Sequence, residues 1–280
     1  MRFFPWNNID PDAAAYIANV QAAGVTDAHL ISIGLPTWAV IQPAINTFYK
    51  TGKSDGWYSP LKRLYLPIWG VAAPNAIDMI ALGSGTFNGT VTHAAGYVQG
   101  DGLTGYFDTA SRFDTLGFTV ETGYQFGLIY SGTLVSLAQI QGAGAAGSNK
   151  QTVLGQAVSL GRARLRHSGT GTGSIEAVTT VNGIISGSRT VGNRSLYKRG
   201  STRSVLISTS GGDSGTIPES NVYALAWNNS DSVGGSSPSA FSNIQLGSYG
   251  FGLGLTDSQD SAFTLALKNL WETCTSLSLP

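Results

Sequence analysis

The sequence predicts a mainly β protein, in which a β-sandwich follows a small helical region and is closed by a C-terminal helix. Only 11% of the 280 residues are charged, whereas 37 are glycine, and this composition favours turn-rich β structure. From about residue 86, short β-prone runs alternate with Gly, Ser, Asn and Asp, at the spacing of sandwich strands. We therefore divide the chain into a helical region, residues 1–85, and a jelly-roll sandwich, residues 86–280.

The helical region begins with a helix whose two ends are marked in the sequence. Asp10 is a suitable cap, Pro11 suits the first helical position, and Gly24 is a typical stop. Apolar residues recur between them at helical spacing, which gives this helix one buried face.

A second helix is predicted from Thr37 to about Lys50, with Gly52 as its end and a kink or restart at Pro43. Three shorter elements complete the region: a turn over 57–62, a strand over 64–69 and a helical turn within 75–83.

About eleven strands are predicted in the sandwich, each bounded by turn-forming residues. They are residues 90–99, 104–109, 118–130, 133–141, 151–158, 162–168, 174–181, 184–190, 204–209, 221–228 and 240–250.

The closing element is a strand followed by an amphipathic helix. The strand contains Phe241, Ile244 and Leu246. It is expected to be followed by a glycine-rich exit segment that contains Gly247, Gly250, Gly252 and Gly254. Thr256 caps the helix, and acidic residues occupy its first turn. Its apolar face contains Phe263, Leu267 and Trp271.

Several of these segments resemble one family, the tailed-bacteriophage structural proteins with a concanavalin A-like (LamG-like) jelly-roll domain. The terminal S-Y-G-x-G-x-G-L-T-D run and helix are similar to the end of such domains. Four earlier stretches match the family's helical preface and sandwich opening in order: Asp12–Ala23, Gln42–Lys53, Trp57–Leu66 and Gly100–Thr109. Ser59-Pro60 and Phe107 depart from the pattern. Residues 142–215 match only in their general alternation of short β-prone runs and turn-forming residues.

The resemblance implies a non-enzymatic virion protein, placed in capsid decoration or capsid fibres, or in a tail fibre or spike. It implies virion localisation after synthesis in the bacterial cytoplasm, with other virion proteins as partners. A homo-oligomer is expected, because 16 basic and 16 acidic residues cancel and such a surface tolerates association. A trimer is expected by analogy with threefold fibres and spikes. No secretion signal or apolar run long enough to span a bilayer is found.

The pattern of acidic residues argues against a glycosidase. Two carboxylates must face each other across the sugar, yet Glu121, Glu176 and Glu219 have no acidic residue two or four positions away. The GGDSGT run at 211–216 lacks the rest of a serine-protease pattern and is interpreted as a turn. No phosphate-binding loop is present, so the sequence predicts neither a nucleotide cofactor nor any other.

Metal and thiol chemistry are also not indicated. Cys274 is the one cysteine, and His29, His93 and His167 are scattered. This set does not provide the ligands of a zinc site, and no base near Cys274 would activate its thiol.

A basic stretch stands out in a neutral chain. Nine basic residues and one acidic residue, Glu176, lie between Lys150 and Arg203. On the strand predicted at 162–168, alternation puts Arg162, Arg164 and Arg166 on one face. That face is either a solvated sheet surface or a docking surface for an acidic partner, such as another virion protein or an anionic glycan. Nucleic acid is not favoured, because few aromatic residues interrupt the basic run.

A second candidate site is the loop that contains Trp227, Asn228, Asn229 and Asp231. It offers oxygen ligands for an ion and an aromatic ring for stacking on a sugar. The alternative is a solvated loop with side-chain turns.

The sequence therefore leaves three functions open. The first is a non-enzymatic virion structural protein, and the second is a carbohydrate-binding module for receptor recognition. A polysaccharide-degrading enzyme is the third, and it lacks an evident carboxylate pair.

Overall fold

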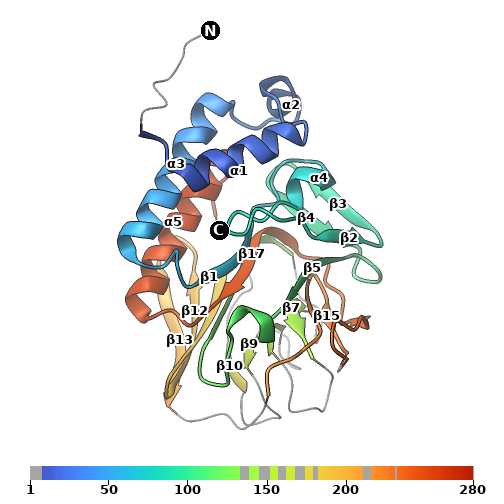
Figure 1. Ribbon diagram of the computed structural model, residues 1–280, viewed down its shortest axis with the longest axis vertical. Coiled ribbons are helices and arrows are strands. Elements are labelled where there is room, and N and C mark those ends of the chain that lie inside the picture. Colours follow the sequence, from blue (N-terminus) through green and yellow to red (C-terminus); the bar gives the residue numbers. More distant parts are fainter. Residues whose placement is uncertain are drawn as a thin grey trace.

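The computed structural model describes residues 8–132, 139–144, 152–156, 162–167, 174–178, 182–210, 216–230 and 232–279. Two mainly antiparallel sheets form a sandwich, and helices pack on the outer face of one sheet (Figure 1). The predicted fold class, a mainly β sandwich with N-terminal helices and a C-terminal helix, is thus confirmed.

Most helices belong to the two ends of the chain. They are α1 (Pro11–Ala22), α2 (Asp27–Ser32), α3 (Trp38–Asp55), α4 (Ala72–Asn75) and α5 (Asp257–Thr275), with a short 3-10 turn at Asp114–Leu116. The cap of α1 is as predicted, since the side chain of Asp10 accepts the backbone N–H groups of Asp12 and Ala13. The short helix α2 was not predicted.

Helix α3 extends beyond its predicted end at Gly52. It continues to Asp55 and ends at Gly56, whose φ of 78° is the left-handed conformation of a typical helix stop. Gly52 lies inside the helix for a packing reason, because a Cβ there would lie 2.5 Å from the ring of Trp57.

The first sheet has eight strands in the order β13-β12-β11-β6-β17-β4-β3, with β1 paired to β17. Their bounds are β1 Leu61–Tyr65, β3 Val91–Ala94, β4 Tyr97–Gly100, β6 Gly123–Ser131, β11 Gly183–Thr190, β12 Asn193–Arg199, β13 Arg203–Ser210 and β17 Gln245–Gly252.

The second sheet has nine strands in the order β10-β9-β8-β7-β14-β5-β2, with β15 and β16 beside β7. Their bounds are β2 Thr86–Asn88, β5 Tyr106–Arg112, β7 Gln139–Ala143, β8 Thr152–Gln156, β9 Arg162–His167, β10 Ser174–Val178, β14 Asn221–Ala224, β15 Trp227–Asn228 and β16 Pro238–Ser239.

Strand β1 connects the first part of the chain to the last. It pairs with β17, so that Leu64 lies opposite Gly250 and Tyr65 opposite Tyr249. The strand begins and ends earlier than the predicted 64–69. Because β1 belongs to residues 1–85, that range contributes a strand to the sandwich as well as helices.

Three glycines of the run, Gly247, Gly250 and Gly252, lie within β17 rather than after it, and Gly254 alone follows the strand, which corrects the sequence interpretation. A Cβ at Gly250 would lie 2.2 Å from the carbonyl oxygen of Arg63 on β1. At Gly247 it would lie 2.4 Å from the indole nitrogen of Trp271. The glycines thus remove side chains where β1 and α5 approach the strand most closely.

Two large clusters of buried residues share the first sheet. One lies between the helices and the sheet and includes Ile45, Trp57, Phe126, Phe263 and Trp271. The other fills the space between the sheets, and Ile129, Leu165 and Tyr249 belong to it. Alternation along the strands separates the two, since Tyr124, Phe126 and Leu128 face the helices and Ile129 faces the second sheet.

Candidate functional site

The three arginines predicted to form a docking row lie on β9, an inner strand between β8 and β10. Leu165 is buried between the sheets, as expected from alternation. The backbone register sets Arg164 opposite Glu176 on β10. The side chains of Arg162, Arg164 and Arg166 lie outside the described part of the structure, so the docking row stays a prediction.

Other cations of the basic stretch take part in the fold. Arg189 is fully buried, and its Nη2 lies 3.0 Å from the Glu121 carboxylate. Arg199 donates from Nε to the Thr264 hydroxyl on α5 at 2.8 Å. Part of the positive charge is therefore used to hold strands and helix together rather than to bind a partner.

The loop predicted to bind an ion or a sugar is organised by Asn228, which is fully buried. Its amide nitrogen donates to the carbonyl oxygens of Asn221 and Gly235, at 2.9 and 2.7 Å, and its oxygen accepts from Ser237 N–H at 2.9 Å. These bonds use the amide to hold the loop. Trp227 pairs with Ser239, and Asn229 N–H donates to the Ser237 carbonyl. Asp231 lies outside the described residues, and ligand binding here stays a prediction.

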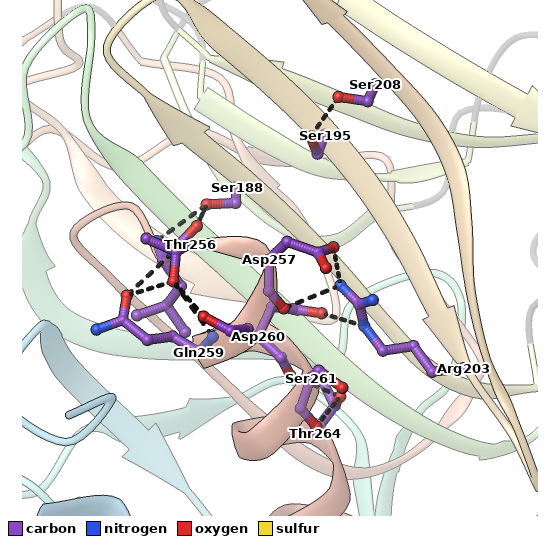
Figure 2. Close-up of polar contacts among 12 residues, drawn as sticks. Ser188, Ser195, Arg203, Ser208, Thr256, Asp257, Gln259, Asp260, Ser261 and Thr264 are labelled. Carbon is purple, nitrogen blue, oxygen red and sulfur yellow. Dashed lines mark hydrogen bonds and ion pairs between the residues drawn. The ribbon is translucent and has the colours of Figure 1, made fainter. Parts of the chain in front are cut away.

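A polar groove lies where β11, β12 and β13 extend beyond the amino end of α5 (Figure 2). Its volume is about 430 Å³. Polar side chains provide most of its lining, with three apolar or aromatic side chains among them. The lining residues are Ser188, Thr190, Asn193, Ser195, Tyr197, Val205, Ser208, Leu255, Thr256 and Asp257.

Three serines cross the floor of the groove from strand to strand. The register sets Ser188 on β11 opposite Ser195 on β12, and Ser195 opposite Ser208 on β13. The hydroxyls of Ser195 and Ser208 are 2.9 Å apart. Ser188 donates to the carbonyl of Leu255 and accepts its N–H, at 2.6 and 2.9 Å. The floor is therefore polar. Because serine is small, these positions also leave space that larger side chains would fill.

The helix wall of the groove begins with a complete capping box. Thr256 accepts the backbone N–H of Gln259, and the Gln259 side chain accepts the backbone N–H of Thr256 at 3.0 Å. Asp257 follows, and 65% of its side chain is exposed. Since the cap already satisfies the helix end, Asp257 is the group that this wall presents to a ligand.

Arg203 connects the groove to a buried polar cluster (Figure 2). Its Nη2 lies 2.7 Å from Asp257 and its Nε lies 2.9 Å from Asp260, which is fully buried. The other Asp260 oxygen accepts from the hydroxyls of Ser186 and Tyr124, at 2.6 and 2.7 Å. Burial raises the pKa of the Asp260 carboxyl, and the hydrogen bonds from Ser186 and Tyr124 and the charge of Arg203 oppose that rise.

The guanidinium of Arg203 also lies over the ring of Tyr197, 4.3 Å from its centroid. Burial raises the pKa of the Tyr197 hydroxyl as well. The arginine is therefore fixed by two carboxylates and an aromatic face. It holds Asp257 and Tyr197, which line the groove, from behind.

The described lining of the groove offers groups whose chemistry suits a polyhydroxylated ligand. Hydroxyls and the amide of Asn193 can each donate and accept, and Val205, with 51% exposure, provides an apolar contact. Asp257 is the one acid among the described residues that line the groove, since Asp260 is buried and paired with Arg203.

Few features of the sequence indicate this groove. Strand β12, which provides Asn193, Ser195 and Tyr197, was not predicted, because its run NRSLYKR places charged residues on both faces. The signal available was the cap at Thr256 and the serines at alternate positions 186 and 188, but only the fold brings these together.

Comparisons with known proteins show likeness only among solved structures. No family model matches the chain, and no curated protein matches it either. One similar structure is domain 4 of an extracellular GH43 arabinanase, AbnA, from Geobacillus stearothermophilus, in complex with arabinotriose. It has 13% identity and a TM-score of 0.48, and the match covers 74% of this chain and 98% of that domain.

Two further similar structures come from sialidases. Trypanosoma rangeli sialidase has 10% identity and a TM-score of 0.44, and the match covers 81% of this chain but 39% of that one. The CBM40 of a Ruminococcus gnavus IT-sialidase, bound to α2,3-sialyllactose, has 13% identity and a TM-score of 0.38, with 65% and 95% covered. Likeness at this level assigns no function to this chain, and none of the three is described as a virion protein.

Among the described residues, no group of three or more His, Cys, Asp or Glu side chains is placed to hold a metal ion. No helix in the described part of the chain is long and apolar enough to cross a membrane.

Proposed function

We propose that this protein is a non-enzymatic glycan-recognition protein that binds its ligand in the polar groove beside α5. The observation that carries the proposal is the composition of the groove: among the described residues, its lining combines hydroxyls, an amide, one exposed carboxylate and an apolar side chain. Sugars offer vicinal hydroxyls and apolar C–H faces, and such a lining complements both.

The geometry supports binding by a rigid surface. The floor serines sit on paired strands, and the wall at Asp257 is held by the ion pair with Arg203 at 2.7 Å. A ligand hydroxyl can therefore bind without reordering the site, and little conformational entropy is lost. The size of about 430 Å³ suits one or two sugar rings of a chain that continues into solvent.

We also propose that the protein acts in the virion of a tailed phage, in a capsid-associated or tail-fibre position, and contacts the host surface there. This part rests on the sequence resemblance. The matching segments meet in the scaffold, since β1 pairs with β17 and α5 packs beside them. They support a shared architecture, and mass spectrometry of purified virions tests the location. Absence of the chain from purified particles would refute it while leaving the groove proposal intact.

The groove proposal is tested with an array of bacterial surface polysaccharides and two tryptophan variants on one strand. Ser208→Trp places a large ring in the groove. Ser204→Trp is the matched control, because Ser204 is exposed, does not line the groove and precedes Val205 on the opposite side of β13.

We expect the wild type and Ser204→Trp to bind the same glycans and Ser208→Trp to lose at least about tenfold in affinity, as steric exclusion from a site does. Equal melting temperatures for the two variants would show that the fold is kept. No glycan bound by the wild type, or unchanged binding by Ser208→Trp, would refute the groove as a glycan site.

A further inference from the structure

A second groove lies on the opposite, outer side of the helix layer, between α3 and α5. Its volume is about 500 Å³. Most of its lining is apolar or small, and Asp55 is the one charged residue among the described residues that line it. The residues are Val40, Pro43, Ala44, Thr47, Phe48, Thr51, Asp55, Ala262, Leu265, Ala266, Asn269, Leu270 and Thr273.

The two helices run antiparallel. Gln259 at the start of α5 donates to the carbonyl of Gly56, just after the end of α3, at 3.0 Å. The inner faces are buried against the sheet and against each other, with Phe48 and Phe263 ring centroids 6.4 Å apart. The outer faces carry small residues at the same level of the pair, including Ala44, Thr47 and Ala266.

Two large apolar side chains project from this outer face. Val40 on α3 is 46% exposed and Leu265 on α5 is 47% exposed. They stand beside the hollow that the small residues leave. One face thus has both projecting side chains and a hollow. Such a face suits an isologous contact, because each copy can place its projecting side chains in the hollow of the other.

We propose that a second copy of this chain covers the α3/α5 face, so that the two helix pairs form a four-helix contact. The lined face runs from Val40 to Asp55 on α3 and from Ala262 to Thr273 on α5, which is about 24 and 18 Å of helix, and two helices side by side are about 20 Å wide. Packing such a face buries roughly 400–600 Å² on each copy, the size of a small, reversible interface.

Charge favours the same occupant. The chain carries 16 basic and 16 acidic residues, so two copies do not repel each other through net charge. Because Asp55 is the one charged residue among the described lining residues, closing this part of the face removes few charges from water. A contact of this kind is twofold, and it differs from the trimer expected by analogy with fibres and spikes.

The dimer would leave the proposed glycan groove open. That groove is bounded on its helix side by Leu255, Thr256 and Asp257, whereas the α3/α5 face begins on α5 at Ala262. The two proposals are independent, and each has its own variants and readout.

Sedimentation velocity over a concentration series tests the dimer. We expect the wild type to sediment as a dimer at micromolar concentration and Leu265→Lys to raise the dissociation constant at least about tenfold, because a lysine ammonium would be buried against apolar side chains. Leu103→Lys is the control, since Leu103 is 75% exposed and lies in the loop before β5, away from the helices.

A second variant guards against local damage to α5. Val40→Lys lies on the other helix and should weaken the dimer in the same way, while circular dichroism and the melting temperature report an intact fold. A monomeric wild type at 100 micromolar, taken as roughly the upper limit for a specific contact, would overturn the proposal. Association that Leu265→Lys and Val40→Lys leave unchanged, or a trimer insensitive to both, would overturn it as well.

Discussion

The two ends of helix α5 meet the same face of the same sheet in opposite ways. Near its carboxyl end the helix is pressed onto the strands. Trp271 is fully buried and donates its indole N–H to the carbonyl of Gly96 at 2.9 Å. Gly247 makes room for it, because a Cβ there would lie 2.4 Å from the indole nitrogen.

At its amino end the helix leaves the sheet uncovered. The strands there carry serines and Arg203 in place of glycine and leucine, and the cap at Thr256 satisfies the backbone without help from the sheet. The difference depends on the side chains that the strands carry. Glycine lets a helix or strand pack closely, whereas the serine hydroxyls and Asp257, which Arg203 holds, line a groove that is open to solvent.

We call the part of the first sheet against which β1 and α5 pack closely the covered region. It should be the least tolerant of added side-chain volume. Replacing Gly250 with alanine would put a Cβ 2.2 Å from the Arg63 carbonyl oxygen, inside the pairing of β1 with β17. Neither backbone can move without losing hydrogen bonds, so we expect a loss of more than about 4 kcal/mol in the free energy of unfolding. Urea denaturation measures it.

Gly83→Ala is the matched control for that substitution. A Cβ at Gly83 meets nothing within 4 Å, and its φ is not positive. We expect a change within about 0.5 kcal/mol, of either sign. A similar loss in both variants would mean that glycine acts through chain flexibility and not through close approach.

The next largest effect is expected at the boundary between the two regions. Asp260→Ala would leave Arg203, Ser186 and Tyr124 without their shared acceptor. Removing one member of a buried pair costs about 3–4 kcal/mol, because the remaining charge stays desolvated. Asp260→Asn keeps an oxygen acceptor and should cost less. Equal stability of the alanine variant and the wild type would show that this cluster does not anchor α5.

The covered region should also make stability depend on pH. Asp78 is 1% exposed, accepts the N–H groups of Leu64 and Ile80, and has Arg63 Nε 3.4 Å away. Burial nevertheless raises the pKa of Asp78 from 3.8 to about 6. The folded state therefore holds this proton at pH values where the unfolded state has released it, and stability should fall as pH rises from about 4 to 6.

A shift of this size corresponds to at most about 3 kcal/mol across that interval. Asp260 changes stability in the same direction, since burial raises its pKa too, so the comparison must be made between variants. Asp78→Asn should flatten the part of the pH profile that belongs to Asp78. An identical slope between pH 4 and 6 in the variant would contradict the assignment.

Local signals predicted the parts of the fold that local chemistry decides. The cap at Asp10 and the cap at Thr256 were visible because side chain and backbone lie within one turn. Gly52 was misread as a helix end, since its role depends on Trp57 lying against it. No strand was predicted at β12, where Arg194, Lys198 and Arg199 place charges on both faces of the run, although Arg199 is only 7% exposed.

The candidate groove could not be predicted for the same reason. Ser188, Ser195 and Ser208 come together only through the register of three strands, and Asp257 reaches them from a helix nearly fifty residues further along the chain. A serine in an isolated strand gives no sign of a site. The glycine run is evident in the sequence. Its role becomes clear only in the fold, where β1 and α5 approach the strand closely.

The smallest effect should appear at Asp257, which shares Arg203 with Asp260 but belongs to the open groove. Its side chain is 65% exposed, against 0% for Asp260. Water screens such a pair, and the loss of a first-turn carboxylate costs little, so Asp257→Asn should lower stability by less than about 1 kcal/mol. The same change removes the one acid that the groove presents, so glycan binding should weaken while melting barely moves. Chemical denaturation and array binding on the same preparation measure both. If Asp257→Asn destabilised the protein as much as Asp260→Ala, the two ends of α5 would not differ in the way that their exposure implies.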